Sequence, residues 1–113
     1  MNIIKAKNWK DIPNNFTGIV EWDNEDLEWF KDNRQHREDG FSYKSYNNDH
    51  YHWALNGIVL FCTNTGKIDL RNKIILSKEQ HPLYSTVQVW KYIDRNGIKE
   101  QIIIPGMEGF IIE

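Results

Sequence analysis

Short runs of apolar and aromatic residues, separated by pairs of turn-forming residues, recur along the whole chain. Such runs are typical of many short antiparallel strands, whereas the spacing of an amphipathic helix is nearly absent. The runs predict strands over 18–22, 27–31, 41–46, 51–55, 58–62, 67–70, 74–76, 85–93, 98–104 and 110–112. The pattern therefore predicts an all-β protein with little or no helix, in which only residues 9–13 offer room for a helical turn, ended by Pro13.

Two Asn-Gly pairs give the strongest turn signals, Asn56-Gly57 and Asn96-Gly97. Both central residues of a type I′ hairpin need a positive φ, which Asn and Gly tolerate better than other residues. Asp32-Asn33 is a weaker version of the same device. These pairs predict tight hairpins between the strands that flank them.

An internal repeat relates residues 18–33 to residues 40–57. Each copy begins at a glycine, runs through one strand, turns through Asn and Asp, and returns in a strand centred on a tryptophan, Trp29 or Trp53. Trp90 marks a candidate third and stretched copy. A short repeat of two strands and two turns predicts stacked antiparallel hairpins that form a curved meander sheet or a small open barrel.

The length of 113 residues predicts a single domain. Within it we expect a lead-in over 1–17, two hairpin repeats over 18–66 and a divergent β segment over 67–113. The single cysteine, Cys62, lies in an apolar run, which indicates a buried and inert thiol in a reducing compartment. We see neither a secretory signal nor an apolar run long enough to span a bilayer, so the expected location is the cytoplasm.

The net charge of −2 conceals an uneven distribution. Residues 11–49 carry ten acidic against four basic residues, and residues 67–100 carry seven basic against four acidic residues. No segment has the dense basic stripe that neutralises phosphates, so direct nucleic-acid binding is not expected. The acidic run forms either a negative face for a basic partner or a solvated hairpin rim. Its members are Glu21, Asp23, Glu25, Asp26 and Glu28.

Aromatic residues are abundant, with five Trp, five Tyr and five Phe. They exceed what a β-core of this size easily encloses. Either some remain at the surface as binding anchors, or they stack between hairpins in place of an aliphatic core. Sugar stacking beside carboxylates is a further alternative. The candidate anchors are Trp22, Trp29, Tyr43 and Tyr46.

The segments "IPNNFTGIVEW", "LEWFKDNRQHREDG" and "YHWALNG" resemble a known repeat family over residues 12–57. Its units read roughly Trp, two residues, Asn-Gly, two residues, His-Arg-Glu-Asp-Gly-Pro-Ala; they are similar to MORN-type β-hairpin repeats and occur largely in bacteriophages, large DNA viruses and some bacteria. Phe41 stands where the family has proline, and Leu60 where a second copy would place its histidine. The resemblance implies a β-hairpin scaffold and a phage gene, and it implies no enzymatic activity.

The segment "HREDG" at residues 36–40 is either a reactive cluster or a turn. We favour the turn, because residues that recur once in every repeat of a family are better explained by geometry than by one active site. Asp39-Gly40 would form an Asx turn, Arg37 and Glu38 an exposed pair, and His36 a hydrogen bond to backbone across the turn. No catalytic residue and no cofactor is predicted, since the chain lacks a nucleophile elbow, a phosphate loop and a dinucleotide fingerprint.

A metal site is the alternative chemistry. His50 and His52 are two residues apart in a predicted strand, so both imidazoles lie on one face and can reach one Zn²⁺. His36, Asp49 or a carboxylate of the acidic run would complete the ligands. This alternative is a small metal-dependent hydrolase.

The preferred hypothesis is a non-enzymatic protein-binding module. In the setting that the resemblance implies, it is a phage-type accessory protein that inhibits or redirects a host protein in the host cytoplasm, for example an anti-defence protein of the anti-CRISPR kind. The acidic run and the aromatic strands would supply the contact. A homodimer paired through the Ile-rich segment at 102–104 is left open.

Overall fold

The computed structural model describes residues 2–47, 50–63 and 67–112. It is all-β, and no α-helix occurs among these residues, so none of them forms a helix able to cross a membrane. The chain divides into two compact units where the sequence suggests one domain. The first unit comprises Met1–Arg37 and Phe41–Thr65, and the second comprises Glu38–Gly40 and Gly66–Glu113.

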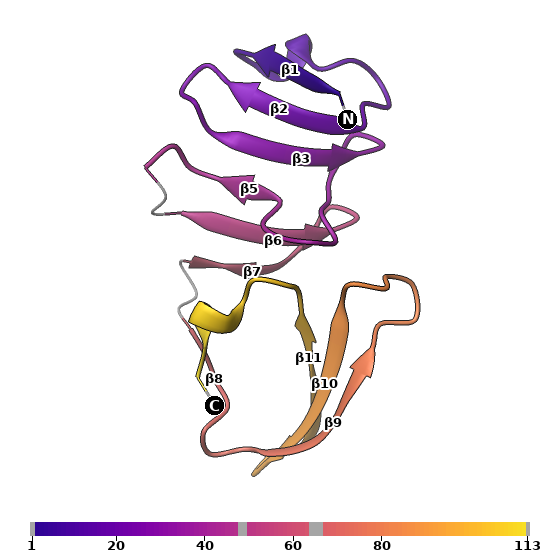
Figure 1. Ribbon diagram of the computed structural model, residues 1–113, viewed down its shortest axis with the longest axis vertical. Helices are drawn as coiled ribbons and strands as arrows, with labels where there is room; N and C mark the ends of the chain where they lie inside the picture. Colours follow the sequence, from indigo (N-terminus) through magenta and orange to yellow (C-terminus); the bar gives the residue numbers. More distant parts are fainter. Residues whose placement is uncertain (1, 48–49, 64–66, 113) are drawn as a thin grey trace. The chain divides into compact units, whose positions relative to one another are not determined.

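The first unit is built on one open, seven-stranded sheet (Figure 1). Its strands are β1 (Ile3–Ala6), β2 (Gly18–Trp22), β3 (Leu27–Lys31), β4 (Arg34–Gln35), β5 (Tyr43–Lys44), β6 (Tyr51–Leu55) and β7 (Ile58–Cys62). The order is β1-β2-β3-β5-β6-β7, with β4 paired to β3. All pairs are antiparallel except β1 with β2. Strands β2, β3, β6 and β7 have the predicted bounds, β5 is shorter than predicted, and β1 and β4 were not predicted.

The second unit contains a three-stranded antiparallel sheet and a separate pair of short parallel strands. The sheet has the order β11-β10-β9, and β12 pairs with β8. The elements are β8 (Ile68–Asp69), β9 (Ile74–Gln80), β10 (Gln88–Asp94), β11 (Gly97–Ile103), the 3-10 turn η3 (Glu108–Phe110) and β12 (Ile111–Ile112). Strand β9 runs longer than predicted and β10 starts later. The open, mostly antiparallel sheets with hairpins confirm the predicted all-β class, and the described residues form no closed barrel.

The hairpin turns follow the predicted chemistry at two places out of three. Asn56 and Gly57 both have a positive φ, at 50° and 80°, and so do Asp32 and Asn33, at 50° and 64°. Between β10 and β11, however, Asp94 pairs with Gly97, and only the glycine has a positive φ, 112°. The type I′ prediction for Asn96-Gly97 is therefore wrong, since Asn96 donates its N–H to Asp94 Oδ1 at 2.8 Å and glycine alone takes the left-handed position.

The two copies of the repeat both form antiparallel hairpins, β2–β3 paired over four residues and β5–β6 over two. Glu28 pairs with Tyr43, and Tyr43 pairs with His52, so the next residues along β3 and β6, Trp29 and Trp53, share the opposite face of the sheet. Trp53 is fully buried against Phe41 and Phe61, with ring centroids 3.8 and 5.0 Å away. Trp90 lies in the second unit, in the β10–β11 hairpin, whose turn has a positive φ at Gly97 and not at Asn96.

The lead-in residues complete the first core. Ala6 of β1 packs with Phe16, Val20 and Phe30 in a buried cluster. The predicted helical turn is present as the 3-10 turn η1 (Trp9–Asp11). Asn8 caps this turn by accepting the Lys10 N–H at 2.9 Å, and the Asp11 carboxylate accepts the N–H of Lys7 at 2.8 Å, which lowers the pKa of Asp11.

Candidate protein-binding surface

A row of polar side chains crosses one face of the first unit's sheet. Glu28, Tyr43 and His52 are directly opposite one another on β3, β5 and β6. This is the face that also carries Val20, the cross-strand partner of Glu28. The row of polar side chains therefore continues directly into the apolar core on the same face. Polar groups where the two meet are buried and need hydrogen-bond partners.

The Glu28 carboxyl is held inside this row. Glu28 is 7% exposed. Trp22 Nε1 donates to Glu28 Oε1 at 3.1 Å, and Gln35 Nε2 donates to Glu28 Oε2 at 2.9 Å. Ser42 Oγ in turn donates to Gln35 Oε1 at 2.8 Å. The position of Glu28 on an exposed acidic rim, which the sequence suggested, is wrong, because the alternation of β3 turns this carboxyl toward the core face.

Burial raises the pKa of Glu28, and the charge of Asp26 acts in the same direction, while the bonds from Gln35 and Trp22 oppose the rise. A raised folded-state pKa means that the folded chain binds the proton more tightly than the unfolded chain does. The contribution of Glu28 to stability is therefore greatest below its ordinary pKa of 4.5 and decreases as the pH rises through the folded-state pKa.

Glu28→Gln is expected to remove the part of the pH dependence of stability that the Glu28 carboxyl causes. The amide still accepts from Trp22, and Gln35 can reverse its own amide because Ser42 Oγ has a second acceptor, the His52 carbonyl oxygen, at 3.2 Å. The free energies of unfolding of the two proteins, measured by urea denaturation from pH 4 to pH 8, should diverge in favour of the variant as the pH rises. A constant difference across this range would show that Glu28 has no raised pKa.

Asp26 and Tyr43 connect the β2–β3 turn to β5. The Tyr43 hydroxyl donates to Asp26 Oδ2, and Tyr46 N–H donates to Asp26 Oδ1 at 2.9 Å. Burial and the bond to Asp26 raise the pKa of Tyr43. Asp26 and Tyr43 thus fix the loop in place, whereas the Tyr46 ring beside them is 67% exposed.

Trp9 is a second exposed aromatic side chain next to this loop. It is 64% exposed and its ring stands edge-on to Trp22, with centroids 5.3 Å apart. Asp23 and Glu25 are exposed, and Glu25 takes a left-handed φ of 70°. Together with Asp26, these residues form what we term the Trp9 surface: Trp9, Trp22, Asp23, Glu25 and Asp26. Trp9 was not among the predicted anchors; the signal for its turn was Asn8 with Asp11 three residues later.

Two hollows indent the Trp9 surface on either side of Trp22 and Asp23. The smaller, of about 300 Å³, is lined by Trp9, Trp22, Asp23, Asn24, Asp26, Glu28 and Tyr43, together with Lys7. The larger, of about 590 Å³, lies between β1 and the β2–β3 turn. Lys5 pairs with Glu21 across the parallel strands. Strand β1 thus brings lysines to an acidic run that contains no base in the sequence, so this surface carries both charge signs.

Trp29, the remaining candidate anchor, lies on the opposite face and is half-buried. The Arg37 guanidinium covers its ring at 4.2 Å, and Arg37 Nη1 donates to the Phe41 carbonyl oxygen at 3.1 Å. His36, which precedes Arg37 in the chain, is buried and accepts the Asn56 N–H through Nδ1 at 2.9 Å. His36 therefore bonds to backbone, but to that of the Asn56-Gly57 turn and not across its own turn at Asp39-Gly40 as expected.

His52 of β6 contacts His50, which lies just before that strand. His50 Nε2 and His52 Nε2 lie 2.8 Å apart, and His50 Nδ1 lies 3.2 Å from Thr63 Oγ1. Burial, followed by the charge of His50, lowers the pKa of His52. Asp49 lies outside the described residues, and among those described no three His, Cys, Asp or Glu side chains are placed to hold a metal ion. The structure gives the hydrolase alternative no third ligand from His36, which is bound to the turn.

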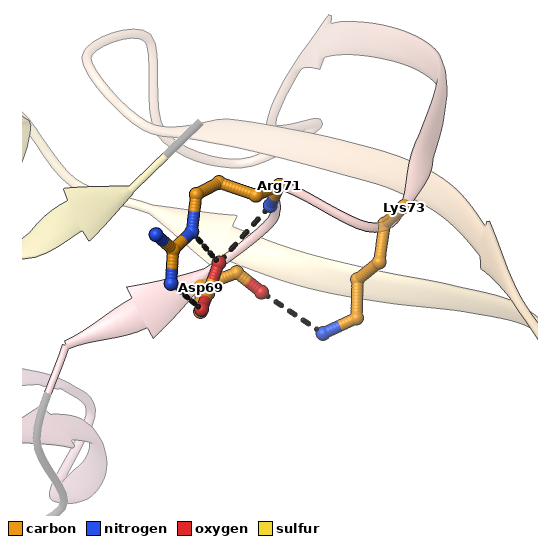
Figure 2. A network of polar contacts seen from close by, with 3 residues as sticks. All are labelled: Asp69, Arg71 and Lys73. Carbon is orange, nitrogen blue, oxygen red and sulfur yellow. Dashed lines mark hydrogen bonds and ion pairs between the residues drawn. The ribbon is translucent and has the colours of Figure 1, made fainter.

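A second charged cluster lies in the second unit, where Arg71 forms a two-pronged ion pair with the Asp69 carboxylate (Figure 2). Arg71 Nη2 and Nε donate to Asp69 Oδ2 and Oδ1 at 2.8 and 3.1 Å. Lys73 Nζ donates to the Asp69 carbonyl oxygen at 3.0 Å. The guanidinium holds the pKa of Asp69 at about 2, and the cluster braces the turn between β8 and β9.

No family model, curated protein or solved structure matches this chain. The resemblance to hairpin repeats over residues 12–57 therefore stays a prediction. The antiparallel pairing within each of the two copies does not depend on it, because the strand register shows that pairing directly.

Proposed function

We propose that the first unit is a non-enzymatic module that binds another protein through the Trp9 surface. The observation that carries this proposal is the exposed ring of Trp9, set against Trp22 beside the Asp23 carboxylate and a hollow of about 300 Å³. Tryptophan is enriched among the residues that dominate binding energy at protein interfaces. Asp26 and Tyr43 hold the adjoining loop, so the surface is preorganised.

The chemistry of the Trp9 surface suits a basic side chain of the partner. Asp23 and Asp26 line the same hollow as Trp9 and Trp22, and carboxylates combined with indole rings attract a guanidinium or ammonium group by ion pairing and by cation–π contact. Lys5 and Lys7 offset part of the negative field. We therefore propose recognition of one protruding Lys or Arg rather than attraction by a uniformly acidic face.

The repeat resemblance supports a biological setting for this contact. In a phage-type accessory protein, the partner would be a host protein in the host cytoplasm, and occupation of its surface would inhibit or redirect it. This part of the proposal rests on the resemblance over residues 12–57 and not on the geometry.

Reversing two exposed charges tests the proposal. Asp23→Lys combined with Glu25→Lys should reduce recovery of the partner in affinity capture from host lysate by at least about tenfold, because like charges now oppose the partner's basic group. The matched control reverses two exposed acids of the second unit, Glu79→Lys and Glu100→Lys. Captured proteins are compared by quantitative mass spectrometry.

Both double variants should retain the melting temperature of the unaltered protein, because all four side chains are exposed. A protein that is lost with the first variant and kept with the control is the expected partner. Equal recovery with both variants would overturn the assignment of the Trp9 surface.

A further inference from the structure

The second unit has a hollow of about 620 Å³, partly open to solvent, that the proposed function does not use. One wall is a face of the three-stranded sheet. Gln88 on β10 pairs with Gln80 on β9 and with Ile103 on β11, which puts these three residues side by side. Trp90, two residues further along β10, lies on the same face and also lines the hollow.

Further lining comes from the chain that follows β11, which Figure 1 shows running from β11 through η3 to β12. It contributes Ile104, Met107 and Ile111. Ile104 and Met107 are 1% and 2% exposed, and the Ile104 N–H donates to Met107 Sδ at 3.1 Å. Ile111 belongs to β12, which pairs with β8. These contacts fix the wall before any ligand arrives, as is usual for small-molecule sites.

The polar side chains that line this hollow are uncharged, and some of their hydrogen-bonding groups have no partner within the described part of the chain. Gln88 Oε1 accepts the Trp90 Nε1 proton at 2.8 Å, which leaves the Gln88 amide N–H groups available. Within the described part of the chain, the side chains of Gln80 and Ser85 have no hydrogen-bond partner. Thr86, at the same rim, donates its hydroxyl to the Glu38 carbonyl oxygen.

Among the described side chains, none that lines the hollow carries a charge, although 27% of the chain is charged. Lys78, the β9 partner of Trp90, lies next to this lining with its Nζ over the Trp90 ring at 4.1 Å. A phosphate or carboxylate would find no counter-ion among these residues, and burying it there would cost its hydration. Primary amides instead present a donor and an acceptor in one plane, which matches the edge of a neutral heterocycle. The apolar side chains of Ile103, Ile104 and Met107 suit the faces of such a ring.

From this arrangement we propose that the second unit has a binding site for an uncharged, planar heterocycle of nucleoside size. The volume of about 620 Å³ lies within the range of about 300–1,000 Å³ that is typical of such sites. The side chains of Gln80, Gln88 and Ser85 form hydrogen bonds with the polar edge of the heterocycle. The aliphatic side chains of the hollow contact the face of its ring. Trp90 closes one side of the site rather than stacking on the ligand, since it is only 7% exposed.

Ligand-observed NMR on the full chain tests this site with adenosine and uridine as probes and adenosine 5′-monophosphate as the charged comparison. At least one nucleoside should show saturable binding, and the monophosphate should bind at least about fivefold more weakly than adenosine. Ser85→Trp, which fills the rim, should weaken nucleoside binding at least tenfold. The matched control is Leu83→Trp in the same loop, where the side chain is 76% exposed and does not line the hollow.

Amide NMR spectra establish whether each variant is folded. If Ser85→Trp is not, Gln80→Ala replaces it, since Gln80 is exposed and its loss should weaken binding about fivefold. Failure of both nucleosides to bind at millimolar concentration would overturn the proposal, as would unchanged binding by the folded variants. Trp9→Ala should leave nucleoside binding unaltered, so the result is independent of the proposed protein-binding surface.

Discussion

Trp53→Ala is expected to lower the free energy of unfolding of the first unit by about 3–5 kcal/mol. Trp53 is completely buried, and its ring is stacked on Phe41 at 3.8 Å and close to Phe61 at 5.0 Å. Removing the indole leaves a cavity between two hairpins that cannot collapse without breaking their pairing. Urea denaturation followed by circular dichroism measures the loss, which is a large part of the usual stability of a domain of about 5–15 kcal/mol.

The matched control for Trp53→Ala is the same change at Trp9. Because Trp9 is 64% exposed and contacts Trp22 and Phe30 by its edge, Trp9→Ala should cost only about 1 kcal/mol. Similar losses in the two variants would contradict the division of the aromatic residues into a core member and a surface member.

The second large effect is expected in binding. Trp9→Ala should weaken the affinity of the partner captured through the Trp9 surface by about 30-fold, or about 2 kcal/mol, the scale of an interface hot spot. The indole offers a large rigid face, and its truncation also removes one wall of the hollow of about 300 Å³ beside Asp23 and Asp26. Isothermal titration calorimetry with the purified partner gives the affinity.

Leu83→Ala serves as the control for this affinity measurement, because Leu83 is 76% exposed and belongs to the second unit. It should leave the affinity within about twofold of the unaltered protein. An affinity that is insensitive to Trp9→Ala but reduced by Leu83→Ala would move the interface to the second unit.

Much of the fold could be predicted because its signals are local. The bounds of β2, β3, β6 and β7 follow from apolar runs that end at turns, and the positive φ of Asn56 and Gly57 follows from residue chemistry. Strand β1 could not be found in this way. Its partner β2 is distant in sequence and parallel, so no turn signal connects the two strands.

The site was less predictable because exposure depends on distant neighbours. Glu28 and Asp23 look alike in the acidic run, yet the pairing of Glu28 with Val20 places one carboxyl beside the core, and the turn leaves the other in solvent. The lysines that join the acidic run come from β1, whose parallel pairing was not predicted. The exposure of Trp9 likewise follows from a single 3-10 turn.

The central claim is that the Trp9 surface binds a basic group of a protein partner. Calorimetric titration tests it most directly. The purified partner is titrated at low and at high salt against the unaltered protein and against the Asp23→Lys, Glu25→Lys variant. We predict that the unaltered protein binds more weakly as salt increases and that the variant loses at least about tenfold in affinity at low salt. Equal affinities for both proteins at both salt concentrations would contradict the claim.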